Sequence, residues 1–244
     1  MDLPVSSMIQ TRVVFHNETT DSQFGIAEIK AEEVPSSPAP HHFILAIDRS
    51  GSMALKERDG MTKMEHVQHT LRNMLRYMAS LDTQIFVSVV AFDDRVDRLE
   101  ERKEVSDETL ADLTSTCDSI VPLNRTDISA ALSEMDWIRQ GDLETNATCI
   151  LLTDGRPTAG VEDAVELEGM VPKDCEVAFV SYGTDHNARL MEALSKGRNA
   201  ENYFVDSAEN AGSVYGEILH GVLFLAGTDI EISVAGCKIY DWRN

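Results

Sequence analysis

Oxygen-bearing side chains gather in three short stretches that lie far apart along the chain. The first reads Asp-Arg-Ser-Gly-Ser at residues 48–52, the second Asn-Arg-Thr-Asp at residues 124–127, and the third Thr-Asp-Gly at residues 153–155. They offer carboxylates and hydroxyls, the hard oxygen donors that suit Mg²⁺, and lack the sulfur and nitrogen donors that zinc favours. The candidate ligands of a divalent ion are Asp48, Ser50, Ser52, Thr126 and Asp154.

The spacing within the first stretch also suits metal binding. Ser50 and Ser52 differ by two positions, so both hydroxyls can point inward from one turn, with Gly51 supplying backbone freedom between them. Taken singly, Asp48 could cap a helix, and the two serines or Asp154 could belong to ordinary turns. Because five donors occur in three separate loops, we favour a shared metal ion. Two carboxylates bound to a doubly charged ion leave little net charge to repel a further anion.

Each stretch is next to an expected regular element. Residues 43–47 and 149–153 are apolar runs typical of strands buried on both faces, and they lead directly into the first and third stretches. The second stretch comes just before an expected helix at residues 127–139. In an open α/β sheet, ligands bind beyond the carboxyl ends of the strands, so we expect the three loops to meet there.

The rest of the chain continues this alternation. Further strands are expected at residues 84–92, 176–181 and 203–205, and helices at residues 62–81, 106–120, 162–169, 187–196 and 208–225. Thr62 and Glu65 form a capping-box pattern at the start of the first helix. The alternation predicts an α/β fold, a Rossmann-like, open and mostly parallel sheet with helices on both faces.

The two ends of the chain have a different pattern. Residues 9–16 and 24–30 read as an antiparallel strand pair, and a Pro-rich connector follows at residues 35–40. We therefore expect three parts. Residues 1–40 form the N-terminal strands and connector, residues 41–226 form the α/β domain, and residues 227–244 form a β-hairpin that pairs with the N-terminal strands.

These motifs resemble the metal-ion-dependent adhesion site (MIDAS) of von Willebrand factor type A (vWA) domains. Residues 48–52 fit the family's Asp-x-Ser-x-Ser motif, its Thr matches Thr126 and its Asp matches Asp154, within a resemblance that covers about residues 41–225. The resemblance implies that the five ligands hold Mg²⁺ or Mn²⁺, directly or through water, and that an Asp or Glu of a protein partner completes the coordination. In some relatives the last helix, here residues 208–225, moves when the ligand arrives.

Two positions depart from the family pattern. Arg125 stands where many relatives have Gly, and Arg49 places a cation inside the first loop. Each could contact the partner's acid or could be a solvated side chain. Together with Asp127 they are the candidate partner contacts.

Composition limits the partners and the location. The chain has 21 Lys and Arg against 42 Asp and Glu, a formal net charge of -21, which argues against nucleic acid and against an anionic membrane surface. The N-terminus lacks the pattern of a signal peptide, no apolar run could span a bilayer, and the four cysteines are scattered. We expect an intracellular, cytoplasmic protein in a reducing compartment.

The favoured hypothesis is a non-catalytic module that binds a protein carboxylate through the metal. One alternative is a metal-dependent hydrolase, which the absence of a His, Lys or Cys base within the three stretches disfavours. The other is a structural subunit of a larger complex that docks through its terminal strands.

Other polar and aromatic residues are interpreted as structural. We expect Asp93 and Asp94 in a solvated loop, His66 and His69 to be exposed, and Trp137 to pack beneath its helix.

Overall fold

A computed structural model shows two compact units, the larger of which comprises Ser37–Leu223. In the other unit, β1 (Ile9–Asn17) and β2 (Gln23–Ala31) pair antiparallel, which confirms the expected N-terminal strand pair. The hairpin expected at residues 227–244 lies outside the described residues. The structure describes residues 9–17, 23–31, 40–154, 156–183, 187–197, 199–205 and 208–223.

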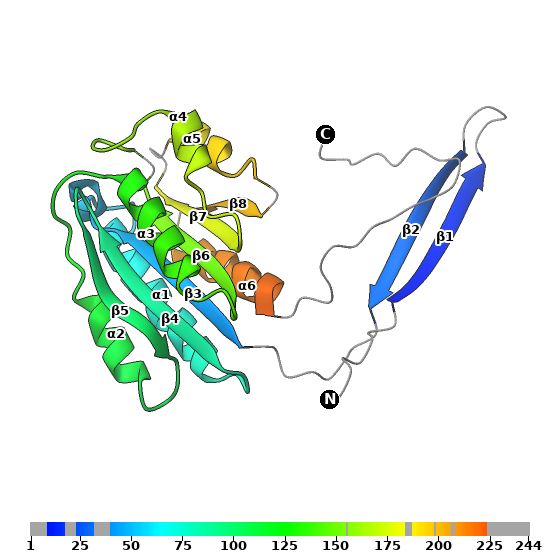
Figure 1. Cartoon of the computed structure of the whole chain (residues 1–244), viewed down its shortest axis with the longest axis horizontal. Helices are drawn as coiled ribbons and strands as arrows, with labels where there is room; N and C mark the ends of the chain where they lie inside the picture. The colour runs from blue at the N-terminus through cyan, green and yellow to red at the C-terminus, as the bar shows by residue number, and fades with distance from the viewer. Residues whose placement is uncertain are drawn as a thin grey trace. The chain divides into compact units, whose positions relative to one another are not determined.

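The larger unit is built on a six-stranded sheet with strand order β5-β4-β3-β6-β7-β8 (Figure 1). All neighbouring strands are parallel except β5, which runs antiparallel to β4. The strands are β3 (His41–Asp48), β4 (Ile85–Phe92), β5 (Val96–Glu104), β6 (Asn146–Thr153), β7 (Glu176–Tyr182) and β8 (Ala200–Val205). The predicted α/β fold with a mostly parallel sheet is confirmed.

Helices cover both faces of this sheet (Figure 1). They are the 3-10 helix η1 (Gly51–Ala54) and the α-helices α1 (Lys63–Ala79), α2 (Leu110–Asp118), α3 (Ile128–Gln140), α4 (Ala164–Gly169), α5 (Ala188–Leu194) and α6 (Ala208–Leu223). The α1 helix begins where the sequence predicted, because the side chains and backbone amides of Thr62 and Glu65 form both hydrogen bonds of a capping box.

Alternate residues of the central strand β3 enter two separate hydrophobic cores. Leu45 packs in the core that includes side chains of α1, α2 and α6, whereas Ile44 packs in the core that includes side chains of α3, α4 and α5. This alternation is the period-2 geometry of a strand. The methionines of α1, Met64, Met74 and Met78, lie in the first core, as the sequence predicted. A strand buried on both faces gives its carboxyl end a fixed position.

The strand β5 was not predicted from the sequence. Seven of its nine residues are charged, and its pairing with β4 is interrupted by two register shifts. An edge strand can be this polar because one of its sides faces solvent, and charges and bulges also discourage pairing with other chains. No hydrophobic alternation therefore revealed it.

Two further expectations about single residues were wrong. His66 is only 4% exposed, because it lies on the inner side of α1 and contacts Asp59. Trp137, expected to pack beneath its helix, is 54% exposed and is stacked by the Arg98 guanidinium, 3.7 Å from the ring centroid.

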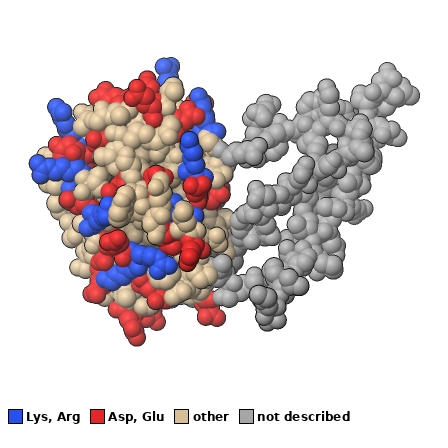
Figure 2. Space-filling view, in the orientation of Figure 1, with Lys and Arg blue, Asp and Glu red and all other residues tan. Residues whose placement is uncertain are grey.

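On the face shown in Figure 2, Lys and Arg side chains lie among Asp and Glu side chains. Within the described residues, no helix combines the length and apolar character needed to cross a membrane.

Candidate metal centre

Asp48 and Asp154 are brought together by neighbouring parallel strands. Asp48 is the last residue of β3, and Asp154 follows Thr153, the last residue of β6. The register pairs Ile47 with Leu152, so that Asp48 and Thr153 come next on the two strands. Thr153 Oγ1 donates a 2.6 Å hydrogen bond to Asp48 Oδ2 in the fully buried interior. The two sequence motifs therefore share one edge of the sheet.

The first loop turns both of its serine hydroxyls toward each other. The backbone amide of Ser50 donates to Asp48 Oδ1 at 2.7 Å, and the Ser50 and Ser52 hydroxyl oxygens lie 3.1 Å apart. Ser50 is buried and Ser52 is half-buried. The two hydroxyls therefore lie next to each other on one turn, and their role as metal ligands stays a prediction.

The second loop lies against the other two. The amide of Gly51 donates to the carbonyl of Asn124 at 2.9 Å, and a Cβ at Gly51 would lie 3.2 Å from another carbonyl of this loop, so a larger residue would fit poorly. On the other side, the amide of Thr126 donates to the Thr158 hydroxyl, and the amide of Thr158 donates back to the Thr126 carbonyl. Thr126, which is 3% exposed, thus lies between the first loop and the segment that follows Asp154.

Asp127 anchors the start of α3. Its carboxylate caps the helix by accepting hydrogen bonds from the Ala130 amide and the Ser129 hydroxyl. Gly160 packs directly on this carboxylate and has φ +69°. A Cβ at position 160 would lie 2.1 Å from Asp127 Oδ1, so the carboxylate leaves no space for a side chain. The Asp127 side chain therefore has a structural role, and its contact with a partner stays a prediction.

The two arginines of the loops are placed differently. Arg49 is 12% exposed and forms ion pairs with Asp93, at 3.4 Å, and with Asp97, at 2.5 Å. Asp93 is only 1% exposed, so the interpretation of a solvated loop was wrong for this residue and holds only for exposed Asp94. Arg125 is exposed, and among the described residues no ion pair holds it. Of the two, Arg125 is the one free to reach a partner.

The electrostatics of the site call for a cation. Burial raises the pKa of Asp48 to about 6, and the charge of nearby Asp154 adds to this, against hydrogen bonds from Thr153 and Ser50 that lower it. Asp154 Oδ1 is buried and accepts no hydrogen bond within the described part of the chain. An orphaned carboxylate oxygen is costly, and a bound ion would satisfy it. The residues present therefore fit a hard divalent cation.

Sequence reasoning missed one charged group at this site. Lys63, the first residue of α1, places Nζ 3.4 Å from Asp154 Oδ2, and its side chain is 2% exposed. The sequence showed only a lysine following a helix cap, a position that is usually solvated.

Among the described residues, no three His, Cys, Asp or Glu side chains group to hold a metal, so an ion here would need hydroxyl ligands besides the two carboxylates.

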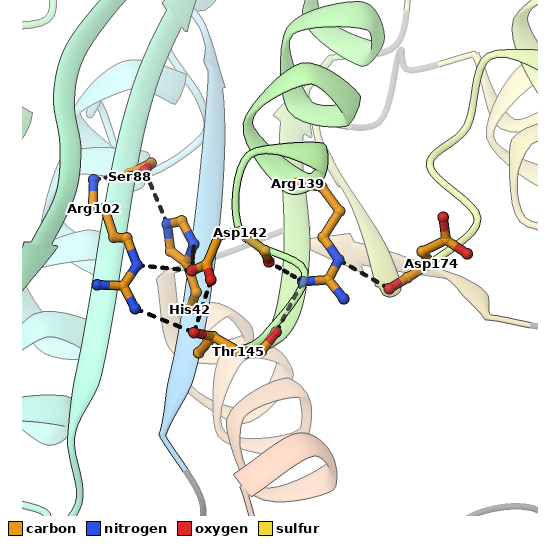
Figure 3. A network of polar contacts seen from close by, with 7 residues as sticks. All are labelled: His42, Ser88, Arg102, Arg139, Asp142, Thr145 and Asp174. Atoms are coloured by element: carbon orange, nitrogen blue, oxygen red, sulfur yellow. Dashed lines mark hydrogen bonds and ion pairs between the residues drawn. The ribbon is translucent and has the colours of Figure 1, made fainter.

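A second polar cluster lies at the opposite end of β3 (Figure 3). His42, near the start of the strand, contacts Asp142 Oδ2 at 3.2 Å and the Ser88 hydroxyl at 2.9 Å. Arg102 joins them, since its Nε donates to Asp142 and its amide donates to Ser88. Six residues at the rise of a strand separate His42 from Asp48 by about 20 Å. The cluster is therefore distinct from the candidate metal site.

The hydrogen bonds run from Ser88 through His42 to Asp142, as in the catalytic triad of a serine hydrolase. The burial of the Ser88 and His42 side chains nevertheless indicates a structural role. Ser88 is 0% and His42 1% exposed, so no substrate can reach the hydroxyl. Burial lowers the pKa of His42, and Asp142 opposes that shift only in part. The cluster joins β3, β4, β5 and the α3–β6 turn.

Comparison with known proteins agrees with this geometry. Residues 43–156 match the family model of the von Willebrand factor type A domain. A curated relative, the uncharacterized protein YfbK of Escherichia coli K12, is 24% identical over 212 residues, which are 84% of this chain and 34% of YfbK. The chain thus spans about a third of the length of that relative.

Solved structures share the fold. A von Willebrand factor type A protein from Catenulispora acidiphila has a TM-score of 0.68 at 14% identity, over 88% of this chain and 47% of that one. Proximal thread matrix protein 1 of the mussel byssus, with a zinc-occupied MIDAS motif, has a TM-score of 0.60 at 15% identity, over 76% and 46% of the two chains. The family match covers residues 43–156, and the solved structures show that the chain shares the fold of von Willebrand factor type A domains.

Proposed function

We propose that this vWA domain is a non-catalytic interaction module that accepts a carboxylate of a protein partner on a bound Mg²⁺ or Mn²⁺ ion. The observation that carries the proposal is the pair of buried carboxylates, Asp48 and Asp154, at adjacent strand ends. One Asp154 oxygen accepts no hydrogen bond from any residue that the structure describes. The zinc-occupied MIDAS of the mussel protein supports a metal at this kind of site. The proposed ligands are Asp48, Ser50, Ser52, Thr126 and Asp154.

The chain's own residues hold the proposed ligands in place. Thr153 and the Ser50 amide each bind one oxygen of Asp48, which fixes the orientation of that carboxylate. The hydroxyl ligands are neutral, so they add oxygen donors without adding negative charge. The ion would supply a positive centre at which an anionic oxygen can replace a water ligand.

No free general base lies beside the candidate ligands among the residues that the structure describes, which supports a binding role over hydrolysis. Lys63 faces Asp154 in an ion pair, and the Asp127 carboxylate is used to cap α3. A base that activates water must have its basic form available beside the reacting atoms. We therefore propose that the domain is not an enzyme, and that its partner is a protein with an accessible Asp or Glu.

A pull-down from native lysate tests this function. Immobilised intact chain is compared with Asp48→Ala, and with Asp94→Ala as a matched control because Asp94 is an exposed acid in a neighbouring loop. We expect the bound partner to be lost with a chelator and with Asp48→Ala, to return with Mg²⁺, and to persist with Asp94→Ala. Capture that resists the chelator would refute the metal-dependent module.

The β1–β2 pair supports a second candidate, a structural subunit that docks through its terminal strands in a larger complex. This pair forms its own two-stranded sheet, so each strand is an edge able to add a strand from another chain. Deleting residues 1–34 should then abolish association while Asp48→Ala leaves it intact. Loss of association with Asp48→Ala, but not with the deletion, favours the metal site.

The sequence also leads us to propose an intracellular location for the protein.

A further inference from the structure

Lys63 is built into the metal site from the side of α1. The carbonyl of Leu55, just after η1, accepts a hydrogen bond from the Lys63 amide at 3.1 Å, and the adjoining Thr62–Glu65 capping box fixes the start of the helix. The first metal-binding loop runs directly into η1, so the same segment positions both the serine ligands and Lys63. Its ammonium then lies 3.4 Å from Asp154 Oδ2.

This placement is unfavourable on local grounds. The first turn of a helix favours anions, because the backbone dipoles leave positive charge there. A lysine ammonium is rarely buried, since its removal from water is unfavourable unless a partner compensates. Lys63 is nevertheless 2% exposed at the first position of α1. Residues that break local rules in this way concentrate at functional sites.

The two oxygens of Asp154 have different surroundings. Oδ2 faces the Lys63 ammonium, whereas Oδ1 is buried and accepts no hydrogen bond within the described residues. One carboxylate can therefore serve two cations at once, with Oδ1 toward the ion and Oδ2 toward the ammonium. Both positive groups would sit within a few ångströms, in a buried setting where their repulsion is weakly screened.

We propose that Lys63 is a positioning residue that shares Asp154 with the metal ion, weakening cation binding and making the loaded site more positive toward an anionic ligand. This inference rests on the proposed function, since it needs the metal. In the metal-free protein Lys63 neutralises Asp154, which stabilises the empty site. In the loaded protein its charge adds to that of the ion and favours a partner carboxylate.

Titration with Mn²⁺ alone tests the inference without any partner. Calorimetry on the full chain compares wild type with Lys63→Met, which keeps an unbranched side chain one atom shorter and removes the charge. The control is Lys56→Met, which removes an exposed lysine of the same segment. We expect Lys63→Met to bind Mn²⁺ at least about tenfold more tightly, because a nearby positive charge is gone. Lys56→Met should bind like wild type.

Thermal unfolding gives a second readout. Without metal, Lys63→Met should have a lower Tm than wild type, since Asp154 loses a cation, and Mn²⁺ should raise its Tm by more than it raises that of wild type. If Lys63→Met does not fold, Lys63→Gln replaces it in both the titration and the unfolding measurement.

The outcomes separate this inference from the proposed function. Equal or weaker Mn²⁺ binding by Lys63→Met, with clear binding by wild type, would overturn the role of Lys63 and leave the metal site standing. Absence of Mn²⁺ binding by wild type and variants alike would overturn both.

Discussion

The hydroxyl of Thr153 bonds the carboxylate of Asp48 at 2.6 Å, across 105 residues of sequence. This contact joins the ends of β3 and β6, and it fixes one Asp48 oxygen while the Ser50 amide fixes the other. The candidate site thus depends on strand adjacency in the sheet, and the loops around it extend from two strands that are buried on both faces.

Replacing Arg49 should destabilise the protein. Arg49→Ala leaves Asp93, which is 1% exposed, without its cation, and breaking such a buried pair costs about 3 kcal/mol. Urea unfolding measures the loss, with Arg95→Ala as the control because Arg95 is exposed in the same loop. Equal stability of the two variants would show that Arg49 does not brace the first loop.

Gly160 should not tolerate a side chain. In Gly160→Ala the new Cβ would meet the Asp127 carboxylate at 2.1 Å, in a backbone with φ +69°. The strain and the disturbed helix cap should cost about 2 kcal/mol and should weaken Mn²⁺ binding, because Thr126 precedes Asp127. Gly169→Ala, with nothing within 4 Å, is the matched control and should unfold like wild type. A harmless Gly160→Ala would contradict the packing of this loop.

Disrupting the cluster of Figure 3 should affect stability and leave the metal site alone. Asp142→Ala removes the acceptor shared by His42, Arg102 and Thr145, with an expected loss of about 3 kcal/mol in the free energy of unfolding. Mn²⁺ affinity of the folded variant should not change, since the site is about 20 Å away along β3. Glu144→Ala, at an exposed neighbour, is the control. A large change in Mn²⁺ affinity would contradict the separation of the two sites.

Acid should destabilise the fold through His41. Burial lowers its pKa from 6.5 to about 4, aided by the charges of His42 and Arg139. The unfolded chain therefore binds the proton first, so the free energy of unfolding is highest above pH 6.5 and falls as the pH drops toward 4, by about 3 kcal/mol from this group.

The comparison of His41→Gln with wild type isolates this group. Unfolding measured at several pH values should show a shallower loss between pH 6.5 and 4 in the variant, because the carboxylates titrate equally in both. Parallel profiles would show that His41 is not the origin of the acid sensitivity.

The sequence predicted those parts of the structure that local patterns encode. Periodicity predicts the buried strand that ends in Asp48 and the one that Asp154 follows, and helix-start chemistry predicts the Thr62–Glu65 cap. The burial of Lys63 and Asp93 did not follow, because each is paired with a residue distant in sequence, Asp154 or Arg49. A charged side chain is predicted to be solvated when only the sequence is known, because the sequence does not reveal its distant partner.

A direct measurement of divalent-metal binding tests the central claim. Calorimetric titration of the intact chain with Mg²⁺ and Mn²⁺ should show saturable binding, and Asp154→Asn should weaken it by at least about a hundredfold, because the orphaned Oδ1 loses its charge. Asp94→Asn, which changes an exposed acid, should bind like wild type. Binding that survives Asp154→Asn unchanged, or no binding by the intact chain, would contradict a metal site at the ends of β3 and β6.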